Sequence, residues 1–198
     1  MYYLSMETGQ RRLFLCIRVP ENLADAISTL ERQHISGSVK WQRNEKLHIT
    51  IAFLGDCSDK EMTIRTAIRH ALASKLVVPF SLAVHEVVAC QTRTLRLLFQ
   101  PVAQEGSIVQ LRTMVHAALH ETKTVEEDKD ERTSISGHLT LARLKGVSQE
   151  WITAYVSAIN APRERPFCEW PRLHVKELCL MSSDSSGFHL VETFPLGD

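Results

Sequence analysis

The sequence lacks the cysteine patterns that cross-link small domains or bind a structural metal. It has five cysteines, an odd number, and no two of them form a Cys-x-x-Cys pair. A disulfide framework or a zinc ribbon is therefore not expected. We expect reduced thiols that mostly pack in the core, because a chain of 198 residues can bury enough apolar surface to fold without cross-links.

A long apolar run is also missing. No segment approaches the roughly 18 apolar residues of a membrane span. Residues 1–12 do not combine a basic start with an apolar stretch of signal-peptide length. We therefore expect a soluble cytoplasmic protein with no membrane partner and no obligate protein partner, for which Met1 and Met6 both fit as the first residue.

The chain has no excess of either charge. Lys+Arg and Asp+Glu number 23 each. Without a strong positive field, long nucleic acid is not attracted by counterion release. A nucleic-acid substrate would have to be short, or bound at one of its ends.

Apolar patterns predict alternating strands and helices in both halves of the chain. Residues 123–137 are charged and poor in apolar side chains, which predicts a mobile loop. The expected strands are 11–20, 39–41, 47–55, 78–90, 94–102, 138–144, 169–183 and 188–196, and the expected helices are 21–34, 60–74, 107–122 and 149–160.

Two of these strands share one sequence pattern. HITIAFLG begins at His48, HLTLARLK begins at His138, and both read histidine, aliphatic, threonine, aliphatic, alanine. Because side chains alternate along a strand, each histidine, threonine and alanine should share one face. The aliphatic residues and Phe53 should lie on the buried face, and the small alanine should leave room for a ligand.

A histidine and a threonine from each half can perform phosphoryl chemistry if the two strands face one cleft. Histidine has an ordinary pKa near 6.5, so one imidazole can act as general base while the other acts as general acid. The threonine hydroxyls would donate hydrogen bonds to non-bridging phosphate oxygens. This scheme needs no metal and no cofactor. One His-x-Thr on a strand is usually structural, and the second copy in a matching context favours function.

With these motifs the sequence resembles the 2H phosphoesterase superfamily, and within it the RNA 2′,3′-cyclic phosphodiesterases, also described as 2′-5′ RNA ligases. The resemblance covers nearly the whole chain through RRLFLCIRVPENL, VKWQRNEKLHITIAFLG, HLTLAR and FHLVETFPL. It implies an α+β fold in which residues 1–198 form a single bilobal domain. Two antiparallel-rich sheets with flanking helices would surround a central cleft with pseudo-two-fold symmetry, and each lobe would hold one motif, at 48–51 and 138–141.

The resemblance also implies an activity, the metal-independent hydrolysis of a terminal RNA 2′,3′-cyclic phosphate to a 2′-phosphate. His48 would donate a proton to the departing O3′, His138 would accept a proton from water, and Thr50 and Thr140 would hold the phosphate. The substrate would be an RNA 3′ end or a small cyclic nucleotide. The family pattern includes Arg143 as a candidate substrate ligand, although strict alternation turns it away from the histidines unless the strand ends or bends there.

Other interpretations stay open. The chain could act as a phosphodiesterase or reversible ligase on 2′-5′ linked oligonucleotides or on another small cyclic phosphate, or it could be a non-catalytic nucleotide-binding module. His116 and His120 are four residues apart on an expected helix, but no third metal ligand is evident, and a solvated helix face is the simpler interpretation. Trp41 is compatible with the core or with base stacking.

Overall fold

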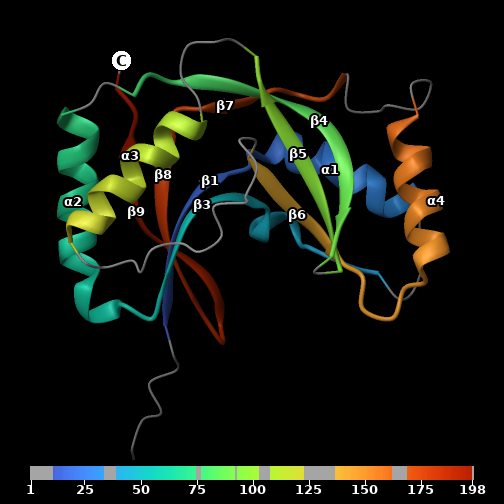
Figure 1. Cartoon of the computed structure of the whole chain (residues 1–198), viewed down its shortest axis with the longest axis horizontal. Coiled ribbons are helices and arrows are strands. Elements are labelled where there is room, and N and C mark those ends of the chain that lie inside the picture. Colours follow the sequence, from blue (N-terminus) through green and yellow to red (C-terminus); the bar gives the residue numbers. More distant parts are fainter. Residues whose placement is uncertain are drawn as a thin grey trace, which may run out of the picture.

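The computed structural model describes residues 11–33, 39–74, 77–91, 93–102, 108–122, 137–161 and 169–197, without the side chains of residues 31–33, 58 and 74. The expectations for Met1, Met6, the loop at 123–136 and Cys168 lie outside these residues. Within them the chain is an α+β protein (Figure 1).

Nine strands in the described ranges form one antiparallel sheet with the order β7-β4-β5-β6-β3-β1-β8-β9, and β2 pairs with β6. Their bounds are β1 Arg12–Arg18, β2 Lys40–Trp41, β3 His48–Gly55, β4 Phe80–Cys90, β5 Thr94–Pro101, β6 His138–Arg143, β7 Leu173–Val175, β8 Glu177–Asp184 and β9 Gly187–Pro195. Two 3-10 turns, Asn44–Lys46 and Ser58–Lys60, precede β3 and α2.

The two sheets predicted from the sequence are the two halves of this single curled sheet. One half contains β7, β4, β5 and β6, the other contains β3, β1, β8 and β9, and they join where Ile49 of β3 pairs with Leu139 of β6. The halves are continuous because the two motif strands are hydrogen-bonded neighbours.

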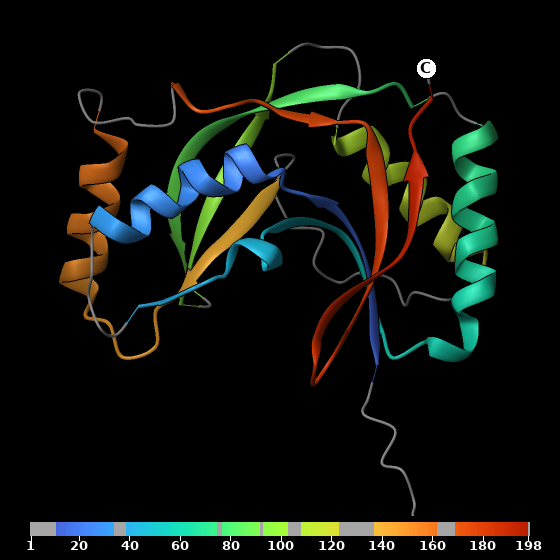
Figure 2. The ribbon, with the colours of Figure 1, turned by 180° about the vertical axis from the view of Figure 1, so that it is seen from behind.

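In the described segments four α-helices cover the sheet: α1 Glu21–Gln33, α2 Glu61–Ser74, α3 Ile108–Glu121 and α4 Gln149–Asn160. Helices α2 and α3 contact each other and pack on the half that contains β3 and β9, while α1 and α4 lie on the half that contains β4 to β6 (Figures 1 and 2). The same order of elements occurs twice, as β1-α1-β3-α2 and as β5-α3-β6-α4. In each, the first helix packs on the half of the sheet that does not contain the strand before it. This is the approximate internal symmetry that the family resemblance implies.

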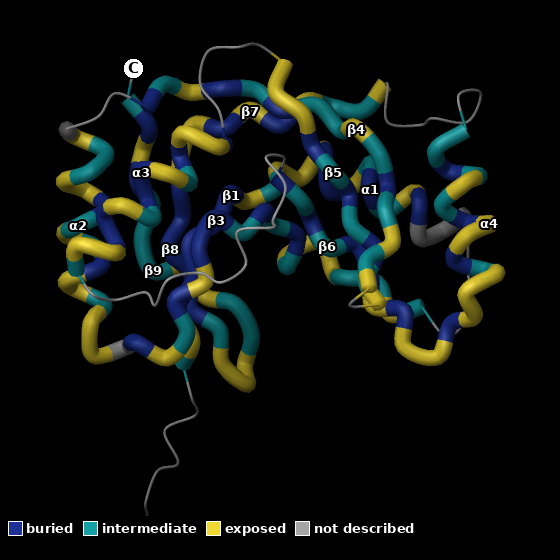
Figure 3. Tube along the Cα trace, in the orientation of Figure 1, coloured by how far each residue is buried: buried dark blue, intermediate teal, exposed yellow. Residues whose placement is uncertain are grey.

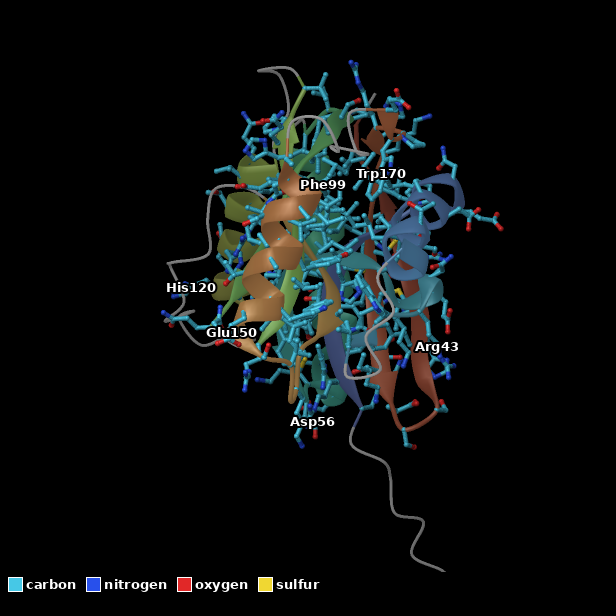
Figure 4. All side chains as sticks on the ribbon, turned by 90° about the vertical axis from the view of Figure 1, so that its right-hand side faces the viewer. Arg43, Asp56, Phe99, His120, Glu150 and Trp170 are labelled. Carbon is cyan, nitrogen blue, oxygen red and sulfur yellow. The ribbon has the colours of Figure 1, made fainter. Side chains whose placement is uncertain are left out.

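The main core lies between the helices and one face of the sheet. Along β1, Leu13, Leu15 and Ile17 belong to this core, and Figure 3 shows such buried stretches in strands of both halves. Phe99 of β5 is its largest fully buried side chain among the described residues (Figure 4). The opposite face of β1 and β8 carries a separate small apolar cluster formed by Phe14, Cys16, Cys179 and Met181, with Phe188 packed against it.

The predicted strand at 169–183 is two strands. Its first part, β7, pairs with β4 at one edge of the sheet, and its second part, β8, pairs with β1 and β9. Lys176 separates them, and its carbonyl accepts a hydrogen bond from the amide of Leu196. No glycine or proline marks this crossing, so the sequence pattern gives no sign of the break.

The four described cysteines are free, and Cys16, Cys57 and Cys179 are buried, which confirms the expected core thiols. Among the described helices, none is long and apolar enough to cross a membrane.

Candidate active site

Both histidine motifs lie on the same face of the sheet. Ile49 and Leu139 pair with each other and point into the core, where both are fully buried. The flanking His48, Thr50, His138 and Thr140 are partly exposed on the opposite face, which we call the site face. Around an antiparallel pair the flanking residues become neighbours across the strands, so His48 lies beside Thr140 and Thr50 beside His138. The two histidines then occupy one diagonal and the two threonines the other.

Each motif strand contains a β-bulge directly after its threonine. In β3, Thr50 opposes Cys16 whereas Ala52 opposes Leu15, so the pairing with β1 skips Ile51. The extra residue of a bulge places two consecutive side chains on the same side, and Ile51 and Ala52 are both buried in the core. The prediction that Ala52 lies beside His48 and leaves room for a ligand is therefore wrong.

The second motif repeats this arrangement. Thr140 opposes Arg96 and Ala142 opposes Leu95, so the pairing of β6 with β5 skips Leu141. Ala142 is fully buried and belongs to the main core. The same correction therefore applies to Ala142, for the same reason.

The two bulges bring two further side chains onto the site face. Phe53 opposes Phe14 and is 61% exposed, so its predicted place in the core is wrong. Arg143 opposes Thr94 on the side of Thr140, and it is exposed. The sequence placed Arg143 near the histidines only if the strand ends or bends, and the bulge at Leu141 provides this bend. Phe53 and Arg143 occupy equivalent positions, five residues after each histidine, and this shared spacing is the signal that strict alternation overlooked.

His48 is held by its own backbone and by two aromatic rings. Its Nδ1 lies 2.7 Å from the carbonyl oxygen of Lys46, so in the neutral ring Nδ1–H donates and Nε2 is the remaining nitrogen. The ring centroid is 5.0 Å from that of Phe14 and 5.5 Å from that of Phe188. Burial lowers the pKa of His48 below its ordinary 6.5, and the hydrogen bond to Lys46 acts in the opposite direction.

His138 has a different environment. Burial, followed by the positive charges of Arg96 and Arg112 and the charge on His48, lowers the pKa of His138 to about 4. The effect of His48 on this pKa indicates that the two imidazoles are close enough to interact. His48 thus contacts two aromatic rings, with Arg18 opposite it in β1, whereas the pKa of His138 is lowered by two arginines in addition to burial.

The structure also places the remaining candidates. His116 is partly exposed on α3, and His120 is exposed (Figure 4). Among the described side chains, no group of three His, Cys, Asp or Glu residues is placed to hold a metal ion. Trp41 packs against Tyr155 of α4, with ring centroids 6.2 Å apart, and so contributes to the core.

Comparisons with known proteins show what this chain is similar to. Residues 17–97 match the family described as LigT like Phosphoesterase. The RNA 2′,3′-cyclic phosphodiesterase of Archaeoglobus fulgidus is 28% identical over 142 residues, which are 70% of this chain and 76% of that protein. The protein of the same name from Methanocaldococcus jannaschii is 37% identical over 51 residues, 26% of this chain and only 30% of that protein's length.

Solved structures show the same fold at low sequence identity. E. coli LigT complexed with 3′-AMP is 18% identical, with a TM-score of 0.66, and the match covers 95% of this chain and 99% of that chain. A protein of Thermus thermophilus is 20% identical, also with a TM-score of 0.66, over 94% and 99% of the two chains. The comparisons therefore confirm the resemblance to LigT-like phosphoesterases of the 2H type that the sequence predicts, and the fold of this chain is that of the solved LigT structures.

Proposed function

We propose that this protein hydrolyses a terminal RNA 2′,3′-cyclic phosphate to a 2′-phosphate. The proposal rests mainly on the arrangement of His48, Thr50, His138 and Thr140 around the Ile49–Leu139 pair. In such an arrangement the two diagonal imidazoles lie on opposite sides of a phosphorus atom placed between them. In-line displacement requires this separation, because the attacking and leaving oxygens lie on opposite sides of the phosphorus. The two archaeal relatives carry the name of this activity.

His48 is the proton donor in this proposal. The carbonyl oxygen of Lys46 accepts the Nδ1–H of His48 and stabilises the imidazolium, which leaves Nε2–H free to protonate O3′. Phe14 and Phe188 pack on the ring and limit its rotation. A donor that is held in place loses little entropy when the transition state forms.

His138 is the proton acceptor. Burial, and after it the charges of Arg96 and Arg112, disfavour its protonated form, so the ring is neutral and can remove a proton from the attacking water. The different environments of the two histidines thus support the roles that the family resemblance implies. By symmetry alone the roles could be exchanged.

The other polar groups of the site face bind substrate in this proposal. Thr50 and Thr140 donate hydrogen bonds to the two non-bridging oxygens. Arg143 and Phe53, which the bulges place on the same face, offer a guanidinium and an exposed ring to the terminal nucleotide. We also propose that the chain forms one bilobal domain, since both halves share a sheet, and that it acts in the cytoplasm, as the sequence predicts.

The test is steady-state turnover on matched substrates. We expect hydrolysis of short RNAs that end in a 2′,3′-cyclic phosphate and slower or no cleavage of 2′-5′ linked dinucleotides of the same bases. The reverse preference would favour the 2′-5′ phosphodiesterase or ligase. Tight binding of a nucleotide without turnover of either substrate would favour the binding module.

A further inference from the structure

The two threonines of the site face have different partners on the outer strands. Thr50 opposes Cys16 of β1, and Thr140 opposes Arg96 of β5. These positions are equivalent under the internal symmetry, because each precedes the bulge after its threonine. Directly opposed residues of an antiparallel pair share a face, so Cys16 and Arg96 both lie on the site face.

The position directly opposite Thr50 is apolar. Cys16 is 1% exposed and packs with Phe14, Cys179 and Met181. Burial, with a smaller contribution from Cys179, raises the pKa of the Cys16 thiol well above its ordinary value, so the thiol is neutral. This side offers a phosphate the hydroxyl of Thr50 and an apolar surface.

The side of Thr140 carries a guanidinium. Leu95 and Leu97 are fully buried in the core, so Arg96 between them extends to the opposite face. Its Nε is buried and has no hydrogen-bond partner in the part of the chain that the structure describes. A buried N–H without a partner is costly, more so in a charged group, and an anion bound beside Thr140 would remove that cost.

We propose that Arg96 is a substrate ligand that binds the non-bridging phosphoryl oxygen on the Thr140 side. A guanidinium presents several N–H donors in one plane, which matches the oxygens of a phosphate. The two non-bridging oxygens are then held unequally, because a guanidinium lies directly opposite Thr140 whereas a neutral thiol lies directly opposite Thr50, and Arg18 of β1 opposes His48 instead. That the bound phosphate is the reacting group rests on the proposed function.

Sulfur substitution tests this inequality. Adenosine 2′,3′-cyclic phosphorothioate exists as two diastereomers, and each places sulfur at a different non-bridging position. We expect the wild-type protein to turn over one diastereomer more slowly, because sulfur accepts hydrogen bonds poorly from Arg96 and Thr140. Arg96→Met should lower kcat on the cyclic phosphate about 10²–10³-fold and bring the two diastereomer rates together. Arg96→Lys should retain part of the discrimination, whereas a merely structural role would slow both diastereomers equally.

Binding of inorganic phosphate gives a readout that does not depend on turnover. Titration calorimetry should show roughly 10–100-fold weaker phosphate binding for Arg96→Met. Arg172→Met is the matched control, because it removes an equal charge from an exposed residue near β7, at the far edge of the sheet. It should leave binding and the diastereomer ratio unchanged.

The outcomes separate the two proposals. Unchanged phosphate affinity and diastereomer ratio in folded Arg96→Met would overturn the role of Arg96 even if RNA is hydrolysed. Weaker phosphate binding without any hydrolysis of cyclic phosphate by the wild-type protein would support Arg96 as the anion ligand and overturn the proposed function.

Discussion

Ile49 and Leu139 pair across β3 and β6, and this contact joins the two halves of the sheet at the point where both histidine motifs begin. The pair also lies at the centre of the internal symmetry. Any change that separates β3 from β6 would move His48 and His138 apart. The geometry of the site therefore depends on core packing beneath it as well as on the four polar side chains above.

Replacing either central histidine should abolish most of the activity. We expect His48→Gln and His138→Gln each to lower kcat about 10²–10⁴-fold, the usual effect of losing a positioned acid or base. His85→Gln is the matched control, because His85 is an exposed histidine of β4. Near wild-type kcat in either site variant, with an unchanged circular dichroism spectrum, would eliminate that residue as acid or base.

The pH dependence of kcat/KM should be shifted to mildly acidic values. His138 must be neutral, which requires a pH above its pKa of about 4, and His48 must be charged, which requires a pH below a pKa that lies under 6.5. We therefore expect a bell-shaped profile with its maximum between these limits. Arg96→Met should move the acidic limb of the profile to higher pH, because a positive charge that opposes protonation of His138 is lost. A maximum above pH 7 would contradict the environments described for the two histidines.

The pH dependence of folding stability should be set by the same two histidines. Both histidines have a folded-state pKa below 6.5, so the unfolded chain binds protons first as the pH falls. Their contribution is complete above pH 6.5 and decreases toward pH 4. Chemical unfolding between pH 6.5 and pH 4 should show that the free energy of unfolding decreases as the pH falls. In His138→Gln this decrease should be smaller.

Removing the exposed ring of Phe53 should weaken substrate binding without unfolding the protein. We expect Phe53→Ala to raise KM by roughly 5–150-fold, the scale of one base-stacking contact, with little change in melting temperature. Met62→Ala is a suitable control because Met62 is equally exposed, at 61%, but lies on α2. A large loss of stability with an unchanged KM would restore the interpretation of Phe53 as a core residue.

An added methyl group at Gly137 should destabilise the protein. A Cβ at this position would collide with Cδ1 of Ile108 and approach Cγ2 of Ile49 to 3.1 Å. We expect Gly137→Ala to lower the free energy of unfolding by about 1–3 kcal/mol, the usual cost of overpacking. Ile108→Val removes Cδ1, so the double variant should recover part of this loss in a thermodynamic cycle. Additive effects of the two substitutions would show that the collision does not occur.

Strict alternation and helical periodicity predicted most elements of this fold. Helix α4 begins and ends where expected, with Ser148 as its N-cap accepting the amide of Trp151 at 3.2 Å. The hairpin of β4 and β5 and the shared site face of His48 and Thr50 were also predicted correctly. In these segments local preference and burial agree, so the pattern is sufficient.

The errors have one physical origin, because pairing across strands is not encoded in the local pattern. A bulge depends on the neighbouring strand, so alternation misplaced Ala52, Ala142 and Phe53. Arg96 was missed for a similar reason. Nothing in its own segment indicates that Thr140 lies opposite, and the ladder between β5 and β6 supplies that information.

The most direct test of the central claim is phosphorus NMR of the product formed from adenosine 2′,3′-cyclic phosphate in ¹⁸O-labelled water. If His138 activates water and His48 protonates O3′, the product is the 2′-phosphate with one ¹⁸O on phosphorus. A product that is mainly the 3′-phosphate would mean that the leaving group is O2′ and would contradict the proposed geometry. A product without ¹⁸O would contradict attack by water.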